Sequence, residues 1–412
     1  MSMNRLSLLY QIRAEGEISN ICALGREKLD EGRMIEDSDD AELPERTDGE
    51  VCNMTNGKTD VAKKVRFPFW LAVCWLAVAV AGCSGDSPGV PTGSPSAPPT
   101  AEKDVQPVAT EQAKLPFAFP LTGLPSAEAV KSRPYMVMVE NSPQARPQSG
   151  LDQADIVYEI LAEGEVTRFA AVFQSRPAKI IGPVRSIRPY FVEIGDGLDA
   201  VIVHAGWSQD AMDMLAGRKL SHLDQVYGDD AYYWRSNERK APHNLYTSVD
   251  KMAQGAEARK FRKEWNGPLL SFAKPDSGQG ATELKGQSAT SVKIPYIHGY
   301  EVTYEYDAAA GVYKRFMEGQ AHADKESGKQ LTATNLMVLE SKHVVLDKEG
   351  RRNVDVFGPG KGYILRQGKA QAVTWERKSG MIRAFADGKE VPLIPGHTWI
   401  QIVPQGSAIE LK

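Results

Sequence analysis

The body of the chain contains two continuous apolar runs, each of which ends in polar residues. They are Tyr135–Asn141 (YMVMVEN) and Asp199–Gly206 (DAVIVHAG). Continuous runs of this kind are typical of strands that are buried on both faces of an α/β sheet. We therefore expect both runs to lie inside one sheet.

Shorter segments between and after these runs complete the first predicted domain. Residues 156–163 and 168–174 predict a pair of strands, because apolar residues flank a glycine-containing turn. Helices are expected at 186–198, 209–215 and 248–265. The pattern predicts an α+β or mixed α/β domain over residues 117–268.

A stretch rich in Gly, Ser and Pro follows Trp265, and beyond it polar and apolar residues alternate over short segments. These segments are 302–307, 312–316, 335–339, 362–366, 372–376 and 399–403. Short strands separated by glycine-containing turns predict a β-rich domain. We place this smaller second domain at residues 290–412.

A basic flank, an apolar run and small residues follow one another at 54–82, directly before Cys83. The apolar run, Phe67–Val80, has 14 residues, fewer than the roughly 20 that a membrane-spanning helix needs. This order is that of a secretory signal peptide. Residues 80–83 (VAGC) resemble the bacterial lipobox, in which the leader is cut before a lipidated cysteine. The alternative is a single anchoring helix that stays uncut.

The residues on either side of this leader predict no folded domain. Residues 1–53 are acidic and lack apolar periodicity, so we interpret them as an overextended gene start or a disordered tail. Residues 83–116 are rich in Ser and Pro and bury too little apolar surface to offset the entropy of ordering. Prolines keep such a segment extended, so we expect it to tether the folded body to the membrane.

Composition and charge exclude several classes of protein. The chain is 42% hydrophobic and 25% charged, as globular proteins commonly are. Its net charge of −4 arises before residue 83, since the remainder carries 39 basic and 39 acidic residues. Because binding to phosphate backbones needs a basic surplus, we predict no nucleic-acid partner. No cysteine follows Cys83, which excludes a disulfide framework and a zinc–thiolate site from the body.

Polar side chains follow the two apolar runs and precede the predicted helices. Ligands of open α/β sheets bind beyond the carboxyl ends of strands, so these loops predict one shared site if the two strands are parallel. The candidate ligand-binding residues are Asn141, Arg146, Arg185, Arg188, His204, Ser208, Arg239, His243 and Asn244. Four arginines suit bidentate binding of a carboxylate or phosphate. The alternative is that they pair internally with Asp155, Glu159 and Glu163.

The sequence lacks the common catalytic and cofactor motifs. There is no GxSxG elbow, no P-loop and no dinucleotide fingerprint. We therefore predict no cofactor and no metal, and assign no catalytic residue. His204 and His243 are candidates for a general base, and the alternative is that both are hydrogen-bonded structural histidines.

A set of motifs follows in order along the body. The motifs are Ala145–Leu151 (ARPQSGL), Ala154–Glu159 (ADIVYE), Ile181–Ser186 (IGPVRS), Ala241–Tyr246 (APHNLY) and Pro395–Trp399 (PGHTW). Together they resemble the YerB-type lipoproteins, a family built on a domain of unknown function. The resemblance implies a lipid-anchored extracytoplasmic protein of two domains, and it brings no established activity.

Two hypotheses follow for the function. The first is a noncatalytic binding or scaffolding protein, anchored by a lipid to the extracytoplasmic face of a bacterial membrane, with an anionic ligand or a protein as partner. The missing catalytic motifs favour it. The second is an envelope hydrolase or transferase that acts on an anionic wall polymer, with a histidine as base and the arginines as an anion clamp.

Overall fold

The computed structural model describes residues 115–273, 284–297 and 300–412. The predicted extension, leader, lipidation site Cys83 and most of the tether therefore lie outside the described residues. Within the described ranges, β-strands dominate and the α-helices are three. The prediction of a mixed α/β first domain is right only coarsely, because sheet makes up most of the regular structure.

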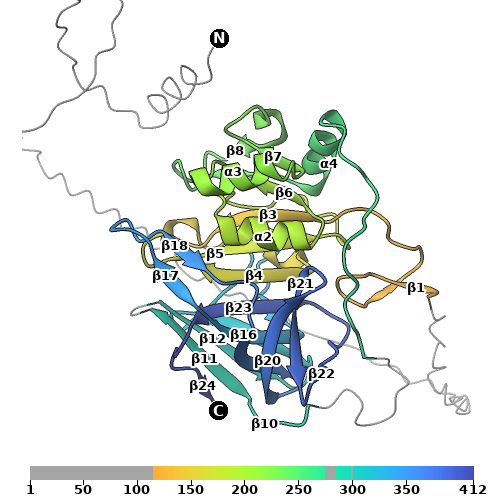
Figure 1. Cartoon of the computed structure of the whole chain (residues 1–412), viewed down its shortest axis with the longest axis vertical. Coiled ribbons are helices and arrows are strands. Elements are labelled where there is room, and N and C mark those ends of the chain that lie inside the picture. The colour runs from red at the N-terminus through yellow and green to blue at the C-terminus, as the bar shows by residue number, and fades with distance from the viewer. Residues whose placement is uncertain (1–114, 274–283, 298–299) are drawn as a thin grey trace, which may run out of the picture. The chain divides into compact units, whose positions relative to one another are not determined.

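One mixed sheet passes through both halves of the described chain (Figure 1). Its strands lie in the order β22-β21-β20-β19-β16-β23-β4-β5-β3-β6-β7, and β10 pairs with β20. The bounds are β3 (Tyr135–Glu140), β4 (Ile156–Leu161), β5 (Thr167–Phe173), β6 (Val201–His204), β7 (His222–Asp224), β10 (Gln287–Ser288), β16 (Asn335–Ser341), β19 (Gly360–Arg366), β20 (Lys369–Lys378), β21 (Met381–Ala386), β22 (Lys389–Glu390) and β23 (Thr398–Pro404).

The two apolar runs form β3 and β6, and these strands pair in parallel. Alternate residues of β3 enter opposite cores, since Met136 and Met138 belong to one apolar cluster and Val137 and Val139 to the other. A strand with both faces covered needs an apolar residue at nearly every position. This requirement explains the continuous run, and the predicted strands are confirmed.

Within the main sheet, the halves of the chain join through a single parallel pair of strands. Strand β23, near the C-terminus, pairs with β4 from Thr398 opposite Ile156 to Ile402 opposite Ile160. The β-rich half therefore extends the sheet of the first half, which the sequence pattern had not predicted. Strand pairing over such a separation leaves no local signal, because periodicity reports which face is buried and not which strand is the neighbour.

Helices cover both faces of the part of the sheet formed by β3, β5 and β6. Helices α2 (Pro189–Gly197) and α3 (Gln209–Gly217) pack on the face seen in Figure 1, and α4 (Val249–Ala258) packs on the other. The predicted helix at 248–265 is too long. Helix α4 ends at Ala258, with Arg259 as its C-cap, and Lys260 takes a left-handed backbone conformation with φ of 57° that a helix cannot continue through.

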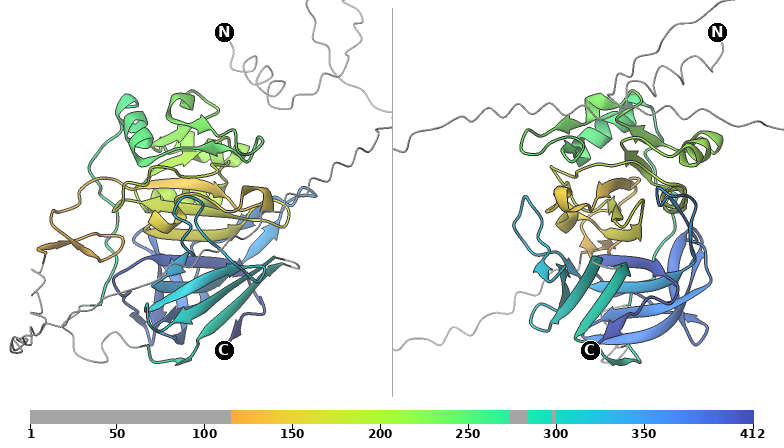
Figure 2. Two further views of the ribbon diagram at one scale, coloured as in Figure 1. Left: turned by 180° about the vertical axis from the view of Figure 1, so that it is seen from behind. Right: turned by 90° about the vertical axis from the view of Figure 1, so that its left-hand side faces the viewer.

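A six-stranded antiparallel sheet packs on the face of the main sheet that α4 also covers, and Figure 2 shows it from behind. Its strands are β11 (Ser291–Ile297), β12 (Tyr300–Asp307), β13 (Val312–Met317), β14 (Gln320–Ala321), β15 (Thr332–Ala333) and β24 (Glu410–Leu411). All six strand segments predicted beyond Trp265 overlap observed strands.

Short pairs of strands complete the described fold. They are β1 (Phe117–Ala118) with β2 (Pro125–Ser126), β8 (Trp234–Arg235) with β9 (Leu245–Tyr246), and β17 (His343–Val345) with β18 (Arg352–Val354). Single turns of 3-10 helix lie at Pro143–Ala145, Leu151–Gln153 and Asp230–Tyr232.

Candidate functional site

The carboxyl end of β3 gathers part of the predicted site around Glu140. The side chain of Glu140 is 6% exposed, and its Oε1 atom lies 3.1 Å from Nη2 of Arg185 and 2.9 Å from Nδ1 of His243. Ser142 donates a hydrogen bond of 2.7 Å to the same oxygen. Two predicted residues are thus brought together, but by a buried carboxylate that the sequence reasoning missed.

Asn141 and Arg146 lie beside this cluster and connect the two halves of the chain. Asn141 is fully buried, and its side-chain amide donates to Thr167 and lies within bonding distance of the Tyr300 hydroxyl. Arg146 donates from Nη2 to the Asn141 carbonyl at 2.9 Å and from Nη1 to Glu318 at 2.8 Å. Both side chains are therefore already engaged inside the protein.

His204 points away from this edge and into the core. It is fully buried, with Nε2 3.1 Å from Nδ1 of His222 and Nδ1 3.0 Å from the Gly206 carbonyl. Burial lowers the pKa of His204 to about 4. The prediction that His204 shares a site with His243 is wrong, because the last residue of a strand covered on both faces is buried with the rest.

Arg239 and Asn244 also serve local structure. Arg239 donates to the carbonyls of Ala145 at 2.8 Å and Pro147 at 2.6 Å. Asn244 donates to the Ser236 carbonyl at 2.9 Å. The bonds of Arg239 hold the segment after β8 against the loop that follows β3, and the bond of Asn244 closes the segment between β8 and β9, so both side chains are already engaged.

The last two predicted residues, Arg188 and Ser208, line a different cleft. Arg188 occupies the N-cap position of α2 and forms an ion pair with Glu163, as the internal-pairing alternative expects. Ser208 occupies the N-cap position of α3. The nine predicted residues therefore divide among separate places, and the single shared site is not observed.

A buried layer of polar side chains between the two sheets was missed altogether. Its centre is the ion pair between Arg315 and Glu159, at 2.8 Å, with both side chains wholly buried. The guanidinium also lies over the rings of Phe169, Tyr304 and Trp399 at 4.8–5.5 Å. The signal was present in the alternation of β13, where Arg315 falls on the buried side with Tyr313 and Met317.

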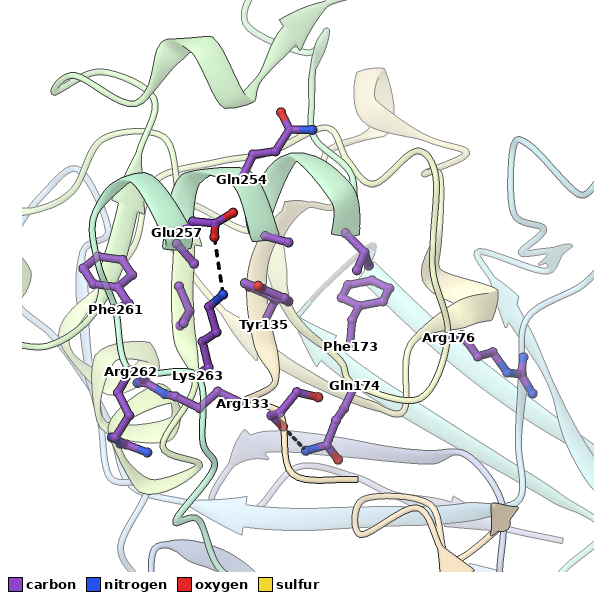
Figure 3. Close-up of a pocket in the computed structure, with 15 residues that line it drawn as sticks. Arg133, Tyr135, Phe173, Gln174, Arg176, Gln254, Glu257, Phe261, Arg262 and Lys263 are labelled. Carbon is purple, nitrogen blue, oxygen red and sulfur yellow. Dashed lines mark hydrogen bonds and ion pairs between the residues drawn. The ribbon is translucent and has the colours of Figure 1, made fainter. Parts of the chain in front are cut away.

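A groove of about 360 Å³ lies beneath α4, at the amino end of β3 (Figure 3). Tyr135 and Phe173, from neighbouring strands, form part of its apolar wall, with Phe261 from the segment after α4.

Arg133 and Arg262 at its edge both contact Asp199, and Lys263 contacts Glu257. The cations of this groove are therefore paired within the protein, apart from Arg176, whose guanidinium donates to the backbone carbonyl of Asp152 and pairs with no carboxylate among the described residues.

The described residues offer neither a metal-binding group nor a membrane-spanning helix. Histidine, cysteine and acidic side chains form no group of three that could hold a metal ion there. Each helix in this part of the chain is too short or too polar to span a bilayer.

We expect Arg185→Ala to lower the free energy of unfolding by about 1–3 kcal/mol, since it takes one of three partners from the buried Glu140 carboxylate. Urea unfolding measures this. Arg218→Ala is the matched control, because Arg218 is 42% exposed and pairs with Glu193 and Asp196 at the surface, where such pairs contribute about 1 kcal/mol or less. Equal losses in the two variants would contradict the structural role of Arg185.

The sequence and fold define a two-domain protein of a family whose function is unknown. Two family models described as "Protein of unknown function (DUF3048)" match this chain. The model of the N-terminal domain matches residues 121–262, and the model of the C-terminal domain matches residues 292–400. The chain belongs to this family, and the YerB-type resemblance drawn from its motifs is confirmed.

One relative is the protein named "Putative lipoprotein YerB" from Bacillus subtilis (strain 168). It is 38% identical over 318 residues, which are 76% of this chain and 92% of the relative. A crystal structure of the YerB protein from Bacillus subtilis superposes on this chain with a TM-score of 0.65 and 37% sequence identity. The match covers 71% of this chain and 99% of the crystallised chain.

Proposed function

We propose that this protein is a lipid-anchored binding or scaffolding protein on the extracytoplasmic face of a bacterial membrane, and not an enzyme. The observation that carries the proposal is that predicted site residues are already paired with other residues of the protein or buried in it. Arg146, Arg185 and Arg188 face carboxylates of the protein itself, and His204 is buried. An anion clamp for catalysis needs cations and a base that reach substrate.

The enzyme alternative depends on His243. Its ring is 23% exposed, and Nδ1 faces Glu140, which leaves Nε2 as the outward atom. A carboxylate that orients a histidine in this way is common in general-base catalysis. Ser142, however, donates to Glu140 and lies 3.4 Å from the same Nδ1 atom, so Nε2 does not activate its hydroxyl.

The anchor is tested by Cys83→Ala. We expect this variant to lose the lipid and, unless an uncut helix remains, to leave the membrane, because the motif VAGC at 80–83 places Cys83 at the cleavage junction. Membrane fractionation and mass spectrometry of the mature protein measure both effects. Recovery of an intact wild-type peptide that spans residues 60–90, with Cys83 unmodified, would reject the anchor.

Incubation of the purified protein with isolated cell envelopes distinguishes a binding function from a catalytic one. Our proposal expects the protein to sediment with the envelopes and to release no new soluble fragments. The enzyme alternative expects fragments whose release is lost in His243→Gln. Release of fragments by wild type but not by this variant would therefore overturn the proposal.

A further inference from the structure

A cleft of about 480 Å³ lies between the N-termini of α2 and α3 and the β17–β18 hairpin. This volume is within the range of sites for small ligands, about 300–1,000 Å³. The lining from the first half of the chain includes Arg188 and Ser208, and the hairpin contributes Arg351 and Arg352. The cleft is therefore built by both halves of the family's architecture.

Three guanidinium groups converge on this cleft, and one of them has no counter-ion. Within the described residues, Arg352 forms no ion pair, whereas Arg351 pairs with Asp347 at the end of the hairpin. Burial lowers the pKa of Arg188, and the nearby positive charge of Arg351 lowers it further. Like charges that line one cleft repel one another, so an anion between them would relieve the repulsion.

Several hydrogen-bonding atoms of the residues that line this cleft are buried, and they have no partner among the described residues. They are Nε of Arg188, Nε of Arg352 and the hydroxyl oxygen of Ser208. Ser208 occupies the N-cap position of α3, yet its side chain makes no capping hydrogen bond. A buried polar atom left unsatisfied costs about 1–3 kcal/mol. Three such atoms lie in the walls of this one cleft.

The acidic groups at this cleft do not make it a cation site. Asp347 is engaged by the side chain and the backbone N–H of Arg351. Glu163 accepts from Arg168 and pairs with Arg188. Asp210 lies in the first turn of α3 and is the one remaining carboxylate in the lining. Three arginines face two aspartates there, so the surplus charge of the lining is positive.

We infer that the cleft binds a phosphate ester, with Arg352 as its main charged contact. Arginine forks match the oxygen geometry of phosphate, and the Ser208 hydroxyl supplies a donor from the opposite wall. The first turn of α3 adds backbone N–H groups to that wall. This inference rests on the proposed function, because it names the class of ligand that a binding protein of this family would hold.

The test is calorimetric titration of the full chain, in detergent, with two probes. Glycerol 3-phosphate represents a free phosphorylated metabolite, and di(glycerol) phosphate represents one linkage of a phosphodiester polymer. We expect wild type to bind at least one probe, and Arg352→Gln to weaken that binding by about tenfold or more. Arg352 has no carboxylate partner in the described part of the chain, so its replacement leaves no buried counter-charge there.

Two further variants control the location of the site. Ser208→Ala is expected to weaken binding by about threefold to tenfold, as the loss of one hydrogen bond does. Arg176→Gln, at the edge of the groove beneath α4, is expected to bind like wild type. Loss of binding in Arg176→Gln but not in Arg352→Gln would overturn the inference, as would wild-type protein that binds neither probe.

Failure of this inference is distinguishable from failure of the proposed function. If Arg352→Gln sediments with envelopes as wild type does, and wild type binds neither phosphate probe, the binding protein stands and its ligand is not a phosphate ester. Fragments released from the envelopes by wild type would instead reject the noncatalytic function, whatever the calorimetry shows.

Discussion

Arg315→Met is expected to lower the free energy of unfolding by about 3–5 kcal/mol, the usual loss when one partner of a buried ion pair is removed. The substitution leaves the Glu159 carboxylate wholly buried without its counter-charge. It also removes the cation that lies over the rings of Tyr304 and Trp399. Burial alone would lower the pKa of Arg315, but the charge of Glu159 and the contacts with Tyr304 together outweigh burial and raise this pKa above its usual range.

Urea unfolding of the single and double variants measures this effect. Arg315→Met combined with Glu159→Gln is expected to recover part of the loss, because neither charge then remains buried alone. Lys314→Met is the matched control on the same strand. Its ammonium group pairs with Asp307 at the surface and is 43% exposed, where a loss of about 1 kcal/mol or less is expected. A loss of that size in Arg315→Met as well would show that the buried layer contributes little.

Much of the fold was predictable because burial leaves a periodic signal. The continuous runs of β3 and β6 and the alternation of β12 and β13 each report how many faces of the strand are covered. The pairing of β23 with β4 was not predictable, since it joins segments more than 200 positions apart. It decides nevertheless that both halves share one sheet.

The candidate site was predicted less well, and the reasons are physical. Arg185 and His243 do lie near the end of β3, as expected from the position of loops at strand ends, but the carboxylate that holds them, Glu140, was not predicted. The prediction also assumed that residues at the ends of strands lie in exposed loops. His204 is the last residue of β6, and all four residues of that strand are buried. The same continuous run that predicts a doubly covered strand should have predicted a buried histidine.

Acidification is expected to destabilise the protein between about pH 6.5 and pH 4, because its buried histidines are held neutral. The pKa values of His204 and His222 are both lowered to about 4, first by burial, and His222 also by the neighbouring ring of His204. The unfolded chain binds these protons at its ordinary pKa near 6.5. Stability from His204 is therefore fully present above that pH and is lost as the pH falls toward 4, by about 3 kcal/mol.

The acidic groups that face this pair act in two ways. Asp229 favours protonation of both rings, and Asp224 does so for His222, but burial outweighs these charges. Burial also raises the pKa of Asp224, so the folded state takes up a proton there before the unfolded chain does. That uptake opposes the loss from the histidines only near the low end of the range.

The measurement is urea unfolding at several pH values from about 7 to about 4.5, with His222→Gln compared with wild type. We expect a smaller dependence of stability on pH in this variant, because one of the two buried rings no longer takes up a proton on unfolding. Ser221→Ala is the neighbouring control. It removes the hydroxyl that accepts from Arg133 and should lower stability equally at every pH, since no titrating group is lost. If the wild-type free energy of unfolding stayed constant between about pH 6.5 and pH 4.5, the buried pair would not be held neutral, and the protons would be accommodated in the fold by repacking around His204.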